Sequence, residues 1–123
     1  MALRDPRILE QTLSAEERAV VDELSRRVHD RYGDSLERLV VFGSRARGDA
    51  RDDSDIDLLV VLRMAPGSEL DAERTIWGLA TEAMAGRRFA PLSIVVLSAD
   101  RFLELLHRER RFALDVAAEG IAL

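Results

Sequence analysis

Residues 42–62 read Phe-Gly-Ser-Arg-Ala-Arg-Gly-Asp-Ala-Arg-Asp-Asp-Ser-Asp-Ile-Asp-Leu-Leu-Val-Val-Leu. An apolar run, Leu39 to Phe42, ends in Gly43-Ser44. Ten residues after the Gly-Ser pair, Asp55 and Asp57 open a second apolar run. Two short apolar runs with polar residues between them are typical of neighbouring strands. The stretch therefore predicts a tight turn beside a pair of carboxylates.

The second run predicts a strand that carries both aspartates on one face. Ile56, Leu58 and Val60 alternate with Asp55 and Asp57. Because successive side chains of a strand point to opposite faces, the two carboxylates would lie on the same face, about 7 Å apart. Like charges held at that distance repel each other unless a cation lies between them. Mg²⁺, which prefers carboxylate and phosphate oxygens, is the cofactor that this pair predicts.

The turn predicts an anion site. Gly43 allows close approach of the backbone, and Ser44 is a favourable N-cap for a short helix through Arg45 and Arg47. Backbone N–H groups at the start of such a helix favour a phosphate group. We therefore expect a triphosphate at Gly43 and Ser44, with oxygens that reach a metal ion at the two aspartates.

The spacing resembles a known signature. Gly43-Ser44, ten residues and then Asp55-Ile56-Asp57 look like the motif of the DNA polymerase beta type nucleotidyltransferases. The surrounding residues 46–48, Ala-Arg-Gly, and 54–58, Ser-Asp-Ile-Asp-Leu, resemble its minimal nucleotidyltransferase branch. The resemblance implies an α/β (α+β) fold with a small mixed sheet flanked by helices.

The resemblance also implies an activity and a set of site residues. The activity is transfer of a nucleoside monophosphate, here taken as AMP from ATP, to an acceptor hydroxyl. Gly43 and Ser44 would bind the nucleotide phosphates, and Asp55 and Asp57 would be the catalytic, Mg²⁺-binding residues. The remaining nucleotide-binding candidates, which would neutralise developing charge, are Arg45 and Arg47.

Two other motifs with related chemistry are excluded, and one plain alternative stays open. Residues 43–48 have the glycine spacing of a P-loop, but Asp49-Ala50 follow where Lys and Ser or Thr are required. Residues 53–57 mimic the first ligands of an EF-hand, but Leu58 and Met64 replace its glycine and its bidentate glutamate. An acidic, solvated loop that runs into an edge strand remains the structural alternative.

One part of the family pattern is missing. Members of the superfamily typically place a third carboxylate on the strand beside the Asp-x-Asp strand, where it completes the metal site and takes the acceptor proton. That strand is expected at Pro91 to Leu97, and its corresponding position is Ser93. A hydroxyl is a poor metal ligand and a weak base, so we expect either slow transfer or nucleotide binding without turnover. Glu82 or Asp53 of this chain, or an acid from another chain, could replace the third carboxylate.

Length and composition limit the remaining choices. The 123 residues, 47% of them hydrophobic, suit a single domain, with residues 1–13 as a loosely ordered lead-in and no second domain for the acceptor. No cysteine is present, and no run approaches the roughly 18 apolar residues of a membrane span. With no signal peptide at the N-terminus, we expect a cytoplasmic protein that does not act at a membrane. The net charge of −5 argues against generic nucleic-acid binding.

Helical periodicity and capping signals outline the rest of the chain. We expect a helix from the Ser14–Glu17 capping box to Gly33, a strand over 36–42, and a helix from Ser68 to about Ala85. A further helix should begin at residues 98–100, and another segment of helix should run over 108–119. The residues expected on the buried sides of the second and third helices are Leu70, Ile76, Trp77, Ala80, Ala83, Met84, Phe102, Leu103, Leu105 and Leu106.

A second hypothesis belongs to a different class of function. Small chains of this family resemble antitoxins that act on a helical ribonuclease of the HEPN type, either by adenylylating the toxin or by masking it. A partner of this kind would supply its own acceptor group. Association with a second copy of the chain, as a homo-oligomer, also stays open. An aminoglycoside-modifying enzyme is disfavoured because no helical drug-binding domain is evident.

Overall fold

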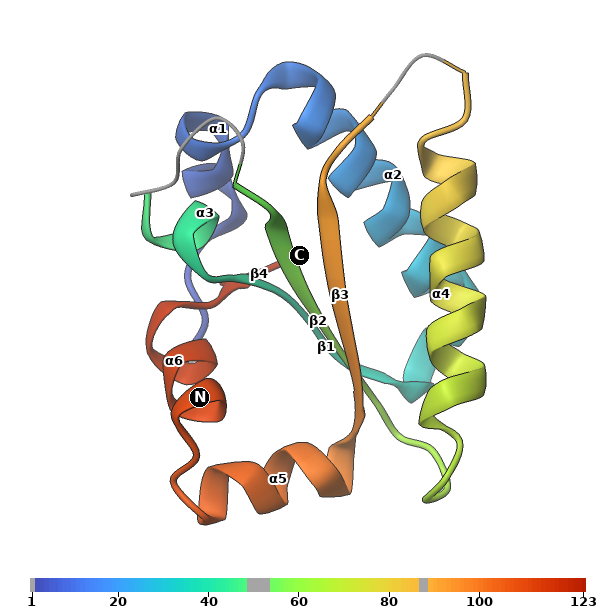
Figure 1. The fold of residues 1–123 in the computed structure, drawn as a ribbon, viewed down its shortest axis with the longest axis vertical. Helices are drawn as coiled ribbons and strands as arrows, with labels where there is room; N and C mark the ends of the chain where they lie inside the picture. The colour runs from blue at the N-terminus through green and yellow to red at the C-terminus, as the bar shows by residue number, and fades with distance from the viewer. Residues whose placement is uncertain (1, 49–53, 87–88) are drawn as a thin grey trace.

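A four-stranded sheet lies at the centre of the structure and carries the motif residues at one of its ends (Figure 1). The computed structural model describes residues 2–48, 54–86 and 89–123. Its strands, in the sheet order β3-β2-β1-β4, are β1 (Leu36–Phe42), β2 (Ile56–Leu62), β3 (Leu92–Ser98) and β4 (Ile121–Ala122). β2 is antiparallel to β1 and parallel to β3, so the predicted mixed sheet is confirmed.

The two central strands divide their side chains between two hydrophobic cores, because successive residues of a strand point to opposite faces. The first face carries Leu39, Val41, Ile56, Leu58, Val60 and Leu62. The second face carries Val40, Leu59 and Val61. Asp57 lies between Ile56 and Leu58 in β2 and therefore belongs to the second face.

Helices α2 (Ala15–Tyr32) and α4 (Glu69–Ala83) cover the first face (Figure 1). The predicted capping box at the start of α2 is confirmed: Ser14 Oγ accepts from the Glu17 N–H at 3.1 Å, and Glu17 Oε1 accepts from the Ser14 N–H at 2.8 Å. Gly33 ends the helix, also as predicted. A cap of this kind contributes about 1 kcal/mol and fixes where α2 begins.

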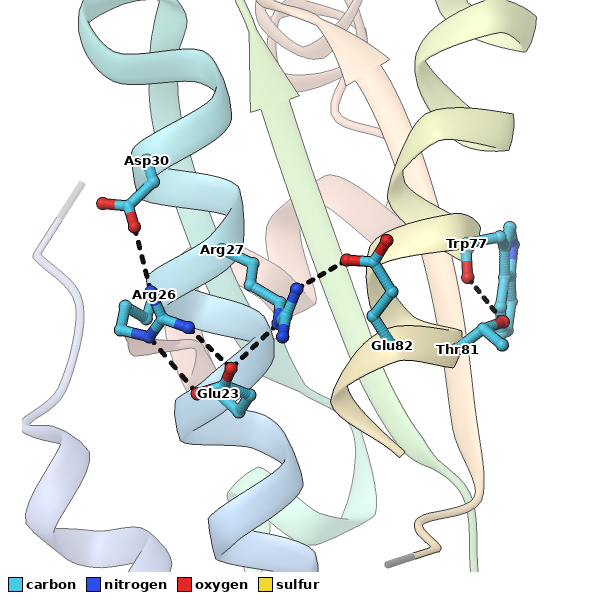
Figure 2. A network of polar contacts seen from close by, with 7 residues as sticks. All are labelled: Glu23, Arg26, Arg27, Asp30, Trp77, Thr81 and Glu82. Carbon is cyan, nitrogen blue, oxygen red and sulfur yellow. Dashed lines mark hydrogen bonds and ion pairs between the residues drawn. The ribbon is translucent and has the colours of Figure 1, made fainter. Parts of the chain in front are cut away.

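An ion-pair network joins α2 to α4 on their outer side (Figure 2). Glu23 accepts hydrogen bonds from Arg26 and Arg27, Arg26 also donates to Asp30, and Arg27 Nη1 lies 2.5 Å from Glu82 Oε2. Hydrogen bonds from the two guanidinium groups lower the pKa of Glu23 to about 2. Exposed pairs of this kind contribute little individually, so the apolar residues beneath them provide most of the stability of this layer.

Helices α5 (Ala99–His107) and α6 (Arg111–Glu119) cover the second face, where Phe102, Ala113 and Val116 are buried (Figure 1). Ser98 caps α5, since its Oγ accepts from the Arg101 N–H at 3.1 Å. The predicted start of this helix is therefore confirmed. The second core is smaller than the first and depends on these two short helices.

Three residues expected in the core are exposed. Leu70 is 58% exposed, Trp77 36% and Leu103 51%. The stripe of α4 that contacts the sheet consists of Ala72, Ile76, Ala80 and Ala83. Trp77 follows Ile76 and is turned about 100° away from that stripe, and Leu103 is turned equally far from buried Phe102. No helix in the described ranges is both long and apolar enough to cross a membrane.

The predicted loose lead-in over residues 1–13 is wrong for the part that the structure describes. Pro6–Ile8 form a 3-10 turn, Leu9–Thr12 form α1, and the side chains of Leu9 and Leu13 are buried in the first core. The elements of this segment have only three and four residues, which is too short for apolar residues to recur with the spacing of a helix or a strand. Its apolar residues are nevertheless part of the main core.

Strand β4 was not predicted, and it connects the two termini. The main chain of Arg4 bridges Ile121: its N–H donates to the Gly120 carbonyl at 2.9 Å and its carbonyl accepts from the Ala122 N–H at 3.1 Å. β4 has only two residues and pairs with β1 at Val40 and Val41. The N-terminal segment thus covers the edge of the sheet nearest to the motif turn.

Candidate functional site

The turn after β1 is built around Gly43. Its φ of +76° lies in a region that glycine adopts readily and other residues do not. The N–H groups of Ala46 and Arg47 both donate to the Gly43 carbonyl at 3.1 Å, which begins the helix α3 (Ser44–Arg47). Gly43 is therefore the N-cap, and the prediction that Ser44 caps the helix is wrong, because Ser44 is the first residue of α3.

Gly43 lies directly against Asp57. Phe42 and Asp57 are partners in the β1–β2 ladder, so the turn begins where this carboxylate leaves the sheet. A Cβ atom placed on Gly43 would lie 2.3 Å from Asp57 Oδ2, well inside van der Waals contact. Any other residue would require a strained backbone and a shift of the Asp57 carboxylate. The two halves of the sequence motif, ten residues apart in the chain, therefore meet at one point.

The two carboxylates form an electrostatically unfavourable pair. Partial burial raises the pKa of Asp57, the charge of Asp55 raises it further, and the charge of Arg47 acts in the opposite direction. A half-buried carboxylate beside a second one is the donor set that a hard divalent cation such as Mg²⁺ neutralises best. The chemistry of the pair thus fits the predicted ion. In residues 2–48, 54–86 and 89–123, however, no group of three or more acidic, histidine or cysteine side chains is placed to hold a metal.

Ser93 lies in the position expected for a third ligand. β3 pairs with β2 in parallel register, and Ser93 is the partner of Asp57 in that ladder. Partners in a ladder present their side chains on the same face of the sheet. The Ile56 N–H also donates to the Pro91 carbonyl at 2.7 Å, which fixes the start of β2 against the start of β3. The absence of a carboxylate at this position is therefore a feature of the site itself.

The structure excludes one of the two acids that could replace the third carboxylate. Glu82 pairs with Arg27 on the outer side of the helices that cover the opposite face of the sheet (Figure 2). From that position Glu82 cannot act as the third carboxylate beside Asp57. Asp53, the other candidate, lies outside the described residues.

Arg47 is placed beside the carboxylates. Its guanidinium contributes to the electrostatics of Asp57, its side chain is 42% exposed, and its Nη1 lies 3.1 Å from Glu119 Oε2 at the end of α6. Sequence reasoning did not single out Glu119, because one acid near the end of a helix has no pattern that marks it. The pair shows that α6 contributes to the wall of the site.

Arg45, in contrast, does not face the site. The residue is 4% exposed, and its guanidinium donates to the Thr12 carbonyl, to Glu17 Oε1 and to the Ser54 carbonyl. These contacts place it beneath the turn, so the predicted contact with nucleotide is wrong for this residue. A helix of four residues is too short to show a periodic pattern of burial, which is why the two arginines could not be distinguished by sequence.

A separate hollow of about 390 Å³ lies at the other end of β2. Its lining includes Leu62, Arg63 and Asp71. The hollow is separated from Asp57 by most of the length of the strand, and it lacks a pair of carboxylates on neighbouring positions. The glycine–aspartate contact, and not the size of a cavity, therefore identifies the candidate site.

Comparisons with known proteins agree with the fold and the motif. The sequence profile of the nucleotidyltransferase domain matches residues 21–87, just over half of the chain. MJ1305 of Methanocaldococcus jannaschii, named as a candidate protein adenylyltransferase, is 33% identical over 63 residues, which are 51% of this chain and 43% of MJ1305. MJ0141 of the same organism, named in the same way, is 34% identical over 47 residues, 38% of this chain and 48% of MJ0141. The chain thus aligns with less than half the length of either relative.

A solved structure supports the fold. The crystal structure of a candidate nucleotidyltransferase from Sulfolobus solfataricus superposes with a TM-score of 0.57 at 21% identity and covers 97% of this chain and 87% of that one. At that level of identity the likeness concerns the fold alone. The superposition nevertheless extends over nearly the whole chain, including the N-terminal segment and α6, which the profile match does not reach.

Proposed function

This chain belongs to the nucleotidyltransferase domain family, and we propose that it transfers AMP from ATP to an acceptor hydroxyl. The observation that carries the proposal is the close approach of Gly43 to Asp57, where an added Cβ would lie 2.3 Å from the Asp57 Oδ2 atom. A nucleotide whose phosphates lie on the turn would have its phosphate oxygens beside the two carboxylates. A divalent cation shared by phosphate and carboxylate oxygens would then hold the two together.

The site residues have distinct roles in the proposal. Gly43 and Ser44 would bind the β- and γ-phosphates, Asp55 and Asp57 would hold Mg²⁺, and Arg47 would exchange its contact with Glu119 for a phosphate oxygen. The ion, when bound, would neutralise phosphate charge and orient the α-phosphate. In the transfer, the acceptor oxygen bonds to the α-phosphorus, the bond from that phosphorus to the oxygen bridging to the β-phosphate breaks, pyrophosphate leaves, and the hydroxyl proton passes to solvent.

Ser93 makes slow transfer the expected behaviour. With a hydroxyl beside Asp57, the acceptor proton has no strong base at that position. General base catalysis typically contributes about 10² to 10⁴ in rate, which is the order of the loss expected here. Binding of the nucleotide needs only the turn and the two aspartates and would be affected less.

The acceptor is proposed to be a hydroxyl on a protein. Both curated relatives carry names of candidate protein adenylyltransferases. The outer end of the site is bordered by α6 through the Arg47–Glu119 pair, so an acceptor would approach over this helix. Serine, threonine and tyrosine side chains supply the required oxygen.

Position-specific labelling tests the proposal. The chain is incubated with Mg²⁺, a helical HEPN-type protein as the candidate acceptor, and ATP labelled either at the α- or at the γ-phosphate. AMP transfer leaves the α label on the acceptor and releases the γ label as pyrophosphate. Label from the γ position on the acceptor would indicate a kinase, and no label from either position, or α label that persists when Asp55 and Asp57 are both replaced by alanine, would refute the transfer.

A second function is favoured by Ser93. A site without its third carboxylate suits a nucleotide-binding partner module that masks a HEPN-type toxin without modifying it. The two functions separate in one experiment, in which the ribonuclease activity of the toxin is measured with wild type and with the Asp55→Ala, Asp57→Ala double variant. Masking predicts equal inhibition by both proteins, whereas adenylylation predicts that the double variant does not inhibit.

A further inference from the structure

Arg45 is buried where the end of α1, the first turn of α2 and the segment before β2 meet. Its Nη1 donates to the Thr12 carbonyl at 3.2 Å, at the end of α1, and to Glu17 Oε1 at 2.9 Å, in the first turn of α2. Its Nη2 donates to the Ser54 carbonyl at 2.9 Å. Thr12 and Glu17 both lie outside the region matched by the family profile, residues 21–87.

The contact with Ser54 is the one that concerns the site. Ser54 immediately precedes Asp55, and Arg45 immediately follows Ser44. One guanidinium therefore connects the phosphate turn to the segment that carries the two carboxylates. The connection is made beneath the site, where it is screened from solvent, because Arg45 is 4% exposed.

We infer that Arg45 is a positioning residue that fixes the spacing between the Gly43–Ser44 turn and the Asp55–Asp57 pair, with Glu17 as the anchor for its guanidinium. The inference rests on the proposed function, since it concerns how one nucleotide with its cation reaches both parts of the site. A ligand that bridges two groups binds more tightly when their spacing is set before it arrives. Arg45 therefore acts on binding without touching the nucleotide.

The geometry requires arginine rather than any cation. The planar guanidinium presents several N–H donors in a fixed fork, so it can reach a carboxylate and two carbonyl groups at once. A lysine ammonium would keep the charge beside Glu17, but it is a single point at the end of a flexible chain. Glu17 is itself held by the Ser14 capping box, so the anchor is fixed to the start of α2.

The inference predicts a change that loss of stability alone would not cause. In wild type, Mg²⁺ should tighten ATP binding, because the cation joins phosphates on the turn to the carboxylates. If Arg45 sets their spacing, Arg45→Lys should lower this metal enhancement while ATP binding without metal stays close to wild type. Partial unfolding would instead weaken both affinities by the same factor.

The test measures the dissociation constant of a non-hydrolysable ATP analogue with Mg²⁺ and with EDTA, at a temperature at which each protein is folded by circular dichroism. The metal enhancement is the dissociation constant in EDTA divided by the dissociation constant in Mg²⁺. We expect it to fall by about tenfold or more in Arg45→Lys, because that is the effect of losing a charge-assisted hydrogen bond. The matched control is Arg27→Lys, which alters an ion pair of α2 with α4 and should leave the enhancement unchanged. If Arg45→Lys does not fold, Glu17→Gln is measured by the same criterion.

The outcomes distinguish the inference from the proposed function. Suppose that Mg²⁺ tightens binding of the ATP analogue to wild type and does so equally in Arg45→Lys, or in Glu17→Gln where that variant replaces it. This result overturns the positioning role and leaves the proposed function intact. A wild type that shows no metal-enhanced ATP binding overturns both. A reduced enhancement in the Arg45 variant with an unchanged one in Arg27→Lys supports the inference.

Discussion

Gly43 and Asp57 lie so close across the β1–β2 pair that a methyl group on the glycine would collide with the Asp57 carboxylate. This contact, made by the residue that follows β1 and a residue in β2, brings the two motif halves into one site. It depends on the absence of a side chain and on a backbone with positive φ.

Gly43→Ala is therefore expected to lower both stability and nucleotide affinity. The positive φ alone costs roughly 1–2 kcal/mol for a residue with a Cβ, and the clash would move Asp57 as well. Chemical denaturation and Mg²⁺–ATP titration measure the two effects. Gly67→Ala is the control, because its φ of +89° carries the same backbone cost with nothing within 4 Å of the added atom. Equal ATP affinity in the two variants would show that the contact does not shape the site.

Asp57→Asn is expected to stabilise the protein at pH 7 in the absence of metal. Burial and the charge of Asp55 raise the pKa of Asp57, so the ionised carboxylate destabilises the folded state. This destabilisation is present above the folded pKa and decreases as the pH falls through that value. The melting temperature of the variant should exceed that of wild type at pH 7, and the difference should shrink in acid. Mg²⁺ should raise the melting temperature of wild type alone.

Asp34→Asn provides the control for that comparison, since Asp34 is exposed between α2 and β1. Its melting temperature should match that of wild type at both pH values. A melting temperature of Asp57→Asn at or below that of wild type at pH 7 would show that the carboxylate is already compensated without a cation.

Acid is expected to weaken the link between Glu17 and Arg45. Burial acts to raise the pKa of Glu17, but hydrogen bonds from Arg45 and the Ser14 N–H and the charge of Arg45 outweigh it, so the pKa is lowered. A lowered folded pKa means that the stabilisation is present above the unfolded value of 4.5 and is lost as pH falls below it. Glu17→Gln should cost about 2–3 kcal/mol at pH 7, the range for losing hydrogen bonds to a charged group, and the difference from wild type should close below pH 4.5 in urea unfolding.

Glu23→Gln is the contrasting variant. Glu23 forms its ion pairs at the surface, where solvent screens them, so the loss of stability at pH 7 should be clearly smaller than that of Glu17→Gln. Because the pKa of Glu23 is about 2, the small loss of stability in Glu23→Gln should persist at pH values at which ionised Glu17 no longer stabilises the fold. A Glu17→Gln difference that stays constant down to about pH 3 would contradict the role of its ionised form.

Ser93→Asp should restore a third carboxylate beside Asp57. Ser93 and Asp57 are ladder partners, so the new side chain would share the face of the existing pair. We expect lower stability without metal, because a third like charge is added, and AMP transfer faster by about 10² or more with Mg²⁺. Ser93→Asn is the matched control, because it adds a side chain of the same size at the same position without a charge or a strong base. Transfer that is no faster in Ser93→Asp than in wild type and in Ser93→Asn would show that the missing base does not limit the rate.

The main elements and the core of the site could be predicted because each has a local signal. The capping box at Ser14 and the glycine at 33 bound α2, and short apolar runs with polar residues between them indicate β1 and β2. The spacing of Gly43-Ser44 and Asp55-Ile56-Asp57 identified the residues that the structure brings together. The resemblance to the family pattern also implied that Ser93 lies beside Asp57, and the register of β2 and β3 confirms it.

The remaining features depend on tertiary contacts that no local pattern encodes. β4 has two residues, and the bridge from Arg4 to Ile121 joins opposite ends of the chain. Arg45 and Arg47 are two residues apart and look alike in sequence, yet one is buried against α2 and the other borders the site. Only the packing of residues 2–17 under α3 separates them.

The most direct measurement of the central claim uses Mn²⁺ in place of Mg²⁺, with the ATP analogue and the ¹⁵N-labelled chain. Paramagnetic broadening should be strongest at the amides of Gly43, Ser44, Asp55 and Asp57, weak at Leu62, and lost when Asp55 and Asp57 are replaced by asparagine. Broadening centred on Asp71 and the hollow at the other end of β2, or broadening of the carboxylate segment without the turn, would contradict a single nucleotide site formed by both.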